Sequence, residues 1–166
     1  NGAALIATPA NGDILAMIGG KNFYDPNSGN VNLTTSKRQP GSTVKVITYS
    51  AALSNGFSAV SVLDDSPVTY TVPGGQSYSP VNYDGKFRGK VPLRLALANS
   101  LNIPAVRTLQ QIGVPTMVRL ARDMGVSSWN EPESSYGLST TLGSSEVTML
   151  DMVTVNSTLA NQGRKV

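Results

Sequence analysis

Two residue types that carry much of protein chemistry are missing from this chain. Its 166 residues include no cysteine and no histidine. Without cysteine no disulfide framework can form, and without either residue zinc and copper lose their preferred ligands. Catalytic triads that depend on histidine or cysteine are excluded as well. We therefore expect no metal site, and any nucleophile must be activated by another kind of base.

Clustered charge and long apolar runs are also scarce. Thirteen Lys and Arg against ten Asp and Glu give a net charge of +3 without any Lys/Arg-rich run, so nucleic acid is not an expected partner. No apolar stretch reaches the roughly 18 residues that a membrane span requires. No signal peptide opens the chain, so we expect any export signal or membrane anchor to lie outside it.

The chain begins with a predicted β-hairpin. Two apolar runs, residues 3–7 and 14–18, flank Asn11 and Gly12, a pair that favours a tight turn. Because both runs are apolar at nearly every position, we expect strands that are covered on both faces. A lone hairpin is marginal in water. We therefore expect an incomplete sheet whose other strands come from elsewhere.

The rest of the chain is predicted to be mostly helical. An apolar helix is expected over residues 42–53, where Lys45 is the only charged residue between positions 39 and 63. Residues 67–89, rich in Gly, Pro, Ser and Tyr, are typical of turns and short extended pieces. Apolar residues at helical spacing, with Pro at starts and Gly at ends, predict further helices. Their ranges are 92–99, 104–112, 115–124 and 144–162.

Ser42 and Lys45 are the ends of a Ser-Thr-Val-Lys motif. Residues three apart lie on one face of a helix, so the Lys45 amine can approach the Ser42 hydroxyl. A serine hydroxyl needs a base to become a good nucleophile. Burial would lower the pKa of Lys45 and make it available as that base. The alternative is that Ser42 caps the helix while Lys45 extends into solvent.

Ser100 and Asn102 form a second motif, Ser-Leu-Asn. Ser100 would extend the apolar stripe of the helix over 92–99 and so point inward. The motif falls in a break between two helices, where side chains can reach a cleft. The alternative is that Asn102 caps the following helix.

Other notable side chains have simpler interpretations. Asp64 and Asp65 are interpreted as a solvated pair of acids at a turn. Trp129 is interpreted as a packing residue beside a loop that contains Glu131 and Glu133.

The segments around both motifs resemble the transpeptidase domain of class A penicillin-binding proteins, which carry Ser-x-x-Lys, Ser-x-Asn and Lys-Thr-Gly motifs. The matches occur in the same order along nearly the whole chain, and several ordered matches are more specific than one motif. They are AMIGG (16–20), RQPGSTVK (38–45), YSPVNYDG (78–85), GKVPLR (89–94), SLN (100–102), LG and EVT within 142–148, and ANQG (160–163).

The resemblance implies an α+β fold of the serine β-lactamase and D,D-peptidase type. Residues 1–166 would form a partial transpeptidase domain with the N-terminal hairpin and most of the helical lobe. Ser42 would be the nucleophile, Lys45 its base and Ser100 a proton relay, while Asn102 would contact the substrate backbone. No cofactor is implied, because acyl transfer at an activated serine needs none.

The resemblance also implies the substrates and the location. Peptidoglycan stem peptides ending in D-Ala-D-Ala and β-lactams would both acylate Ser42. The parent protein would be membrane-anchored and act on the extracytoplasmic face of the bacterial cell membrane. The chain contains no Lys-Thr-Gly or Lys-Ser-Gly, so we expect these residues alone to be nearly inactive and a complementing fragment or strand to supply that motif.

Two other functions fit the same motifs. A serine β-lactamase would need a glutamate to activate water, and Glu131 and Glu133 lie in the corresponding region. A non-catalytic penicilloyl-binding sensor could also keep Ser-x-x-Lys.

Overall fold

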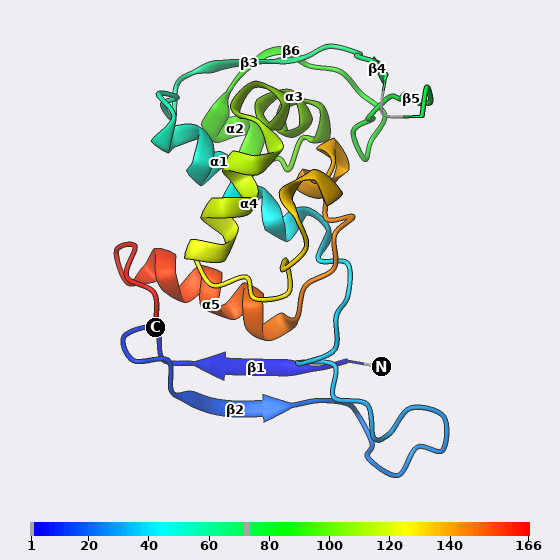
Figure 1. Ribbon diagram of the computed structural model, residues 1–166, viewed down its shortest axis with the longest axis vertical. Coiled ribbons are helices and arrows are strands. Elements are labelled where there is room, and N and C mark those ends of the chain that lie inside the picture. Colours follow the sequence, from blue (N-terminus) through cyan, green and yellow to red (C-terminus); the bar gives the residue numbers. More distant parts are fainter. Residues whose placement is uncertain (1, 72–73) are drawn as a thin grey trace.

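The computed structural model describes residues 2–71 and 74–166 and has an α+β architecture (Figure 1). A β-hairpin lies at one end, helix α5 runs along it, and the other helices and two small ribbons lie beyond α5. The predicted fold class is confirmed. None of the helices in these two ranges is long and apolar enough to cross a membrane.

The hairpin pairs β1 (Ala4–Ala7) with β2 (Ile14–Ile18) in antiparallel register. Gly12 adopts a φ of +78°, as the turn requires. Helix α5 (Met149–Ala160) packs on β1, whose residues are alternately exposed and half-buried. All five residues of β2 are exposed. Within the described residues nothing covers β2, so cover on both faces stays a prediction for a sheet that is completed by strands from elsewhere.

Helix α1 (Lys45–Ser54) lies at the centre of the helical lobe because it is apolar on nearly every side. Val44 and Ile47 pack with α4 (Val114–Asp123) in one hydrophobic cluster. Tyr49 and Ala52 pack in a second cluster, which includes residues of α2 (Leu93–Ala98) and α3 (Asn102–Ile112).

The helix starts differ from the predictions by one to five residues, most clearly in two helices. The helix expected over 42–53 is a 3-10 turn, η1 (Gly41–Val44), followed by α1. The helix expected over 144–162 begins only at Met149, because Thr148 caps it in a capping box with Asp151. Just before this cap, Val147 bridges to Arg38.

The segment before α2 forms two ribbons, as its composition predicts. Strand β3 (Val62–Asp65) pairs with β6 (Gly89–Pro92), and β4 (Tyr70–Thr71) pairs with β5 (Ser77–Tyr78). Within the predicted range 67–89, positions 72–73 lie outside the described residues. The interpretation of both acids here as solvated is wrong for Asp65, which is 0% exposed on β3.

Candidate active site

The Lys45 side chain lies inside the helical lobe and contacts the second motif. The residue is 1% exposed. Its Nζ lies 2.6 Å from the carbonyl oxygen of Ser100, 2.6 Å from Asn102 Oδ1 and 3.1 Å from Ser100 Oγ. The predicted burial is confirmed, and the alternative in which Lys45 extends into solvent is wrong. Three of the four predicted site residues are thus in direct contact, although the two motifs lie far apart in the sequence.

Lys45 Nζ donates to three oxygens. An ammonium has three N–H donors, and the carbonyl oxygen of Ser100, the hydroxyl oxygen of Ser100 and the amide oxygen of Asn102 can each accept one. Burial lowers the pKa of Lys45 to about 8. Loss of one proton from the amine leaves a lone pair that can face the Ser100 hydroxyl. Lys45 and Ser100 are therefore placed so that they could exchange a proton.

Ser100 reaches Lys45 from a strained turn and not from a helix face. Helix α2 ends at Ala98, and Ser100 is an exposed residue with a φ of +52°. The prediction that it extends the apolar stripe of α2 is therefore wrong. The left-handed conformation costs a side chain about 1–2 kcal/mol. In this conformation both the carbonyl oxygen and the hydroxyl of Ser100 contact Lys45 Nζ.

Asn102 is the first residue of α3, and its side chain does not cap that helix. The N-cap position belongs to Leu101, which makes no side-chain cap hydrogen bond. Asn102 Nδ2 instead donates to the carbonyl oxygen of Val81 at 2.7 Å, while its Oδ1 accepts from Lys45. The capping alternative is wrong. The side chain bridges the loop before β6 and the buried amine.

Ser42 lies on η1, one turn before Lys45. It is exposed, and it lines a cavity of about 430 Å³ together with Ser100, Asn102 and the loop that contains residues 82–84. Within residues 2–71 and 74–166, no hydrogen bond joins Ser42 Oγ to Lys45 Nζ. The structure therefore brings Ser42 to the same cavity as the second motif, whereas the amine itself contacts Ser100.

The turn that carries Ser42 rests directly on η3 (Leu138–Leu142). Gly143 follows η3 with a φ of +86° and is buried. A Cβ atom at this position would overlap the backbone N, O and Cα of Gly41. Only glycine allows this approach, so Gly143 helps to fix the backbone next to Ser42.

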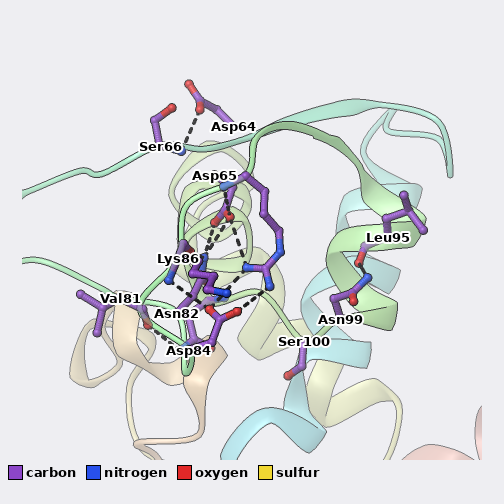
Figure 2. Close-up of polar contacts among 12 residues, drawn as sticks. Asp64, Asp65, Ser66, Val81, Asn82, Asp84, Lys86, Leu95, Asn99 and Ser100 are labelled. Carbon is purple, nitrogen blue, oxygen red and sulfur yellow. Dashed lines mark hydrogen bonds and ion pairs between the residues drawn. The ribbon is translucent and has the colours of Figure 1, made fainter.

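Two residues next to the site were not among the predicted site residues. Asn82 is buried, and its Oδ1 accepts from the backbone N–H of Asn102 at 2.8 Å. Asp65 in turn accepts from Asn82 Nδ2 (Figure 2). Asn82 lies within the matched segment 78–85, which is the one clue that could have identified it. For Asp65 no clue was available.

The two glutamates considered for a β-lactamase lie elsewhere. Neither Glu131 nor Glu133 lines the cavity that contains Ser42. Glu133 pairs with Arg119 at 3.1 Å, and the backbone oxygen of Glu131 accepts from Arg122. Glu131 lies in a loop, as predicted, whereas Glu133 begins a short 3-10 helix, η2 (Glu133–Ser135). Trp129 is 2% exposed in the core, which confirms its packing role.

Comparison with known sequences identifies the relatives of the chain. The penicillin-binding protein transpeptidase domain matches residues 2–166. Penicillin-binding protein 1A of Rickettsia felis is 36% identical over 167 residues, which cover 100% of this chain and 20% of that protein. Penicillin-binding protein 1A of Neisseria meningitidis serogroup A is also 36% identical, over 99% of this chain and 20% of its own. The chain thus spans about a fifth of the length of these curated relatives.

Solved structures agree with the sequence matches. Penicillin-binding protein 1A from Haemophilus influenzae has a TM-score of 0.83 and 27% identity, over 99% of this chain and 26% of that one. PonA1 from Mycobacterium tuberculosis in complex with penicillin V has a TM-score of 0.78 and 25% identity, over 95% of this chain and 43% of that one. With a family match along nearly its whole length and relatives above 30% identity, the chain belongs to the transpeptidase-domain family of the class A penicillin-binding proteins.

Proposed function

We propose that this chain carries the acylating residues of a peptidoglycan D,D-transpeptidase and forms part of its transpeptidase domain. Ser42 is the nucleophile, Lys45 the base, Ser100 the proton relay and Asn102 a substrate contact. The observation that carries the proposal is the buried Lys45 amine, which is held by both residues of the second motif beside the cavity that Ser42 lines.

The first half-reaction forms an ester at Ser42. Ser42 Oγ attacks the carbonyl carbon between the two D-alanines of a stem peptide, and its proton passes to the Lys45 amine. The carbon–nitrogen bond then breaks, and Ser100 returns the proton from Lys45 to the leaving nitrogen, which departs as D-alanine. Catalytic hydrogen bonds are often long before substrate binds, so we expect Ser42 to turn toward Lys45 and Ser100 in the complex.

The second half-reaction transfers the acyl group. An amino group on a neighbouring stem peptide attacks the ester carbonyl, the Ser42 Oγ–carbon bond breaks, and the proton of the amine returns to Ser42 through the same residues. A β-lactam would acylate Ser42 in the same way, which agrees with the penicillin V complex of the related PonA1. Both substrates place the parent protein on the cell-wall side of the membrane, to which we expect it to be anchored.

The complete activity is proposed for a protein that extends beyond these residues. The chain spans about a fifth of its curated relatives and contains no Lys-Thr-Gly. In the family this third motif lies on a strand that also supplies an oxyanion donor. Loss of one such donor costs about 100-fold to 1,000-fold in rate, so we expect residues 1–166 alone to be acylated very slowly.

Labelling with a fluorescent penicillin tests this function. A full-length protein that contains this chain should be labelled stoichiometrically, with the adduct located on Ser42 by mass spectrometry. Ser42→Ala should abolish labelling, whereas Ser54→Ala, at an exposed serine in the last turn of α1, should leave it unchanged. An adduct on a different residue, or no adduct on the full-length protein, would show that the proposed function is wrong.

A further inference from the structure

Asp65 is a buried carboxylate that the proposed chemistry does not use. It ends β3, is 0% exposed, and accepts hydrogen bonds from Asn82 Nδ2 at 2.7 and 2.9 Å and from the backbone N–H of Arg88 at 2.9 Å. The Arg88 guanidinium lies 4.0 Å away. Figure 2 shows Asp65 pointing toward Asn82, whereas the neighbouring Asp64 points away toward Ser66. Asp65 therefore holds both ends of the loop from 82 to 88.

The Asp65 carboxylate fixes which way the Asn82 amide faces. Asn82 Nδ2 donates to Asp65 and to the carbonyl oxygen of Lys86 at 2.8 Å, so the Oδ1 atom is turned toward the backbone N–H of Asn102. The reversed amide would direct its oxygen at the carboxylate and its N–H groups at another N–H. A carboxylate accepts only, so just one orientation satisfies all partners.

Asn82 and its neighbour Val81 fix Asn102 in the same manner. The backbone N–H of Asn102 is bonded to Asn82, and Asn102 Nδ2 is bonded to the carbonyl oxygen of Val81. Only Oδ1 of Asn102 remains, and it lies 2.6 Å from Lys45 Nζ. Hydrogen bonds thus connect Asp65 through Asn82 to the backbone of Asn102, and the side chain of Asn102 accepts from the amine.

The charge of Asp65 is also felt on the helix that carries Lys45. Burial, and secondly the Asp65 charge, raise the pKa of Tyr49 well above its ordinary value. Tyr49 lies one turn after Lys45 on α1. The carboxylate is therefore close enough to this helix to influence ionisation there.

We propose that Asp65 and Asn82 are positioning residues of the active site, which hold the backbone of Asn102 and thereby keep its side chain against the Lys45 amine for proton transfer. The expected effect of these residues on the acylation rate rests on the proposed function. The positioning itself concerns only residues of this chain, so it can be measured without turnover.

Asp65→Asn is the central variant, because it keeps the shape of the side chain and turns one acceptor into a donor. The new amide would face N–H groups of Asn82 or Arg88, and the loop from 82 to 88 would lose its anchor. Asp64→Asn is the matched control. Asp64 is the neighbouring acid on the same strand, and its side chain contacts Ser66 and Lys90 and not the site.

The first measurement is the ionisation of Lys45 in this chain, followed by NMR of isotopically labelled lysine side chains and assigned with Lys45→Arg. Asp65→Asn frees the loop that holds Asn102 and so weakens an acceptor of the ammonium, and the titration midpoint of Lys45 should therefore move to lower pH. Asp64→Asn should leave it unchanged. If the midpoint is the same in Asp65→Asn and the unaltered chain, the positioning role is wrong.

The second measurement is the acylation rate constant of the full-length protein with a fluorescent penicillin. Small misplacement of a catalytic group can cost up to about 100-fold, so Asp65→Asn should acylate about 10-fold to 100-fold more slowly, with its pH–rate midpoint moved in the direction seen by NMR. Equal rates in Asp65→Asn and Asp64→Asn would overturn the inference. An unaltered protein that is not labelled would instead overturn the proposed function, while the NMR result would still test the positioning. If Asp65→Asn does not fold, Asn82→Ser replaces it with the same expected outcomes.

Discussion

Lys45 and Asp151 are both buried titratable side chains, but their surroundings have opposite effects on the charged form of each. Lys45 meets three oxygens, and burial lowers its pKa toward the neutral form. Burial alone would raise the pKa of the Asp151 carboxyl. Hydrogen bonds from Ser128, Thr148 and Ser127 outweigh burial, so the pKa of Asp151 lies below its ordinary value. One site favours loss of charge and the other preserves it.

The difference separates a candidate site of proton transfer from a structural site. Asp151 forms the capping box of α5 with Thr148 and joins the N-terminus of α5 to the loop after α4. Its carboxylate accepts from the backbone N–H of Ser127, the Ser127 hydroxyl and the backbone N–H of Thr148. Lys45 lies beside a cavity and next to a hydroxyl that can exchange a proton with it. A buried group whose neutral form is favoured next to a cavity is a candidate for proton transfer. We expect substitutions at the two sites to have opposite effects on activity and stability.

The largest effect is expected for Lys45→Met in the full-length protein. Methionine fills a similar volume but cannot accept a proton, and general bases contribute about 100-fold to 10,000-fold to rate. We expect acylation by a fluorescent penicillin to fall by about 1,000-fold. The free energy of unfolding should change by no more than about 2 kcal/mol, since removal of a buried charge offsets the oxygens left without a donor. A large loss of stability with retained acylation would contradict the contrast drawn between Lys45 and Asp151.

The pH dependence of unfolding is a second test of the contrast between Lys45 and Asp151. The pKa of Lys45 is about 8 in the folded chain and 10.5 in its ordinary state. Below pH 8 the amine is charged in both states, and folding bears the cost of burying it. Between pH 8 and 10.5 the unfolded state binds the proton more tightly, so this residue should make stability rise with pH. Urea unfolding of Lys45→Met should lack that rise.

Asp151→Asn is expected to lower stability and leave acylation unchanged. The N–H groups of the new amide would face the donors of Ser127, Ser128 and Thr148, which bind the carboxylate in the unaltered chain. We expect this to cost about 2–3 kcal/mol. Urea unfolding of the chain should detect this loss, whereas Asp123→Asn, at an exposed acid that ends α4, should stay within about 0.5 kcal/mol. The Asp151 contribution is present above the unfolded carboxyl pKa of about 4 and disappears as pH falls through the lower folded value.

An acylation defect in Asp151→Asn would contradict the division into two kinds of site. It would mean that the start of α5 influences the cavity, although its contacts are with the loop after α4.

Gly143→Ala is expected to have a moderate effect and tests whether packing as well as charge sets the cavity. The added Cβ would overlap the backbone of Gly41, so the turn that carries Ser42 must shift. We expect about 1–3 kcal/mol of destabilisation and a roughly tenfold slower acylation. Gly163→Ala is the control, since Gly163 has the same φ of +86° and no atom within 4 Å of the added Cβ. Equal defects in both variants would assign the effect to backbone strain alone.

Local patterns predicted the helices and the hairpin, because these depend on residues near in sequence. The ends of the helices were less accurate. The N-terminus of α5 depends on the Thr148–Asp151 capping box and on the bridge from Val147 to Arg38, and that bridge joins segments distant in sequence. All five residues of β2 are exposed within the described residues. The apolar sequence of β2 does not indicate which elements would pack on it.

The grouping of the candidate site residues was predicted where a motif marks them and missed where only tertiary contacts do. Lys45, Ser100 and Asn102 do contact one another, and Ser42 lines the same cavity. The burial of Asp65 could not be predicted, since two adjacent acids on a short strand resemble a solvated turn until Asn82 and Arg88 are known to surround one of them.

The left-handed turn at Ser100 has a consequence for protein engineering. Glycine adopts this backbone shape without strain, so a library sorted only for heat tolerance should enrich glycine at position 100. The same exchange deletes the hydroxyl beside the amine. Selection for thermal stability should therefore favour glycine at position 100, whereas selection for the proposed acylation should favour serine.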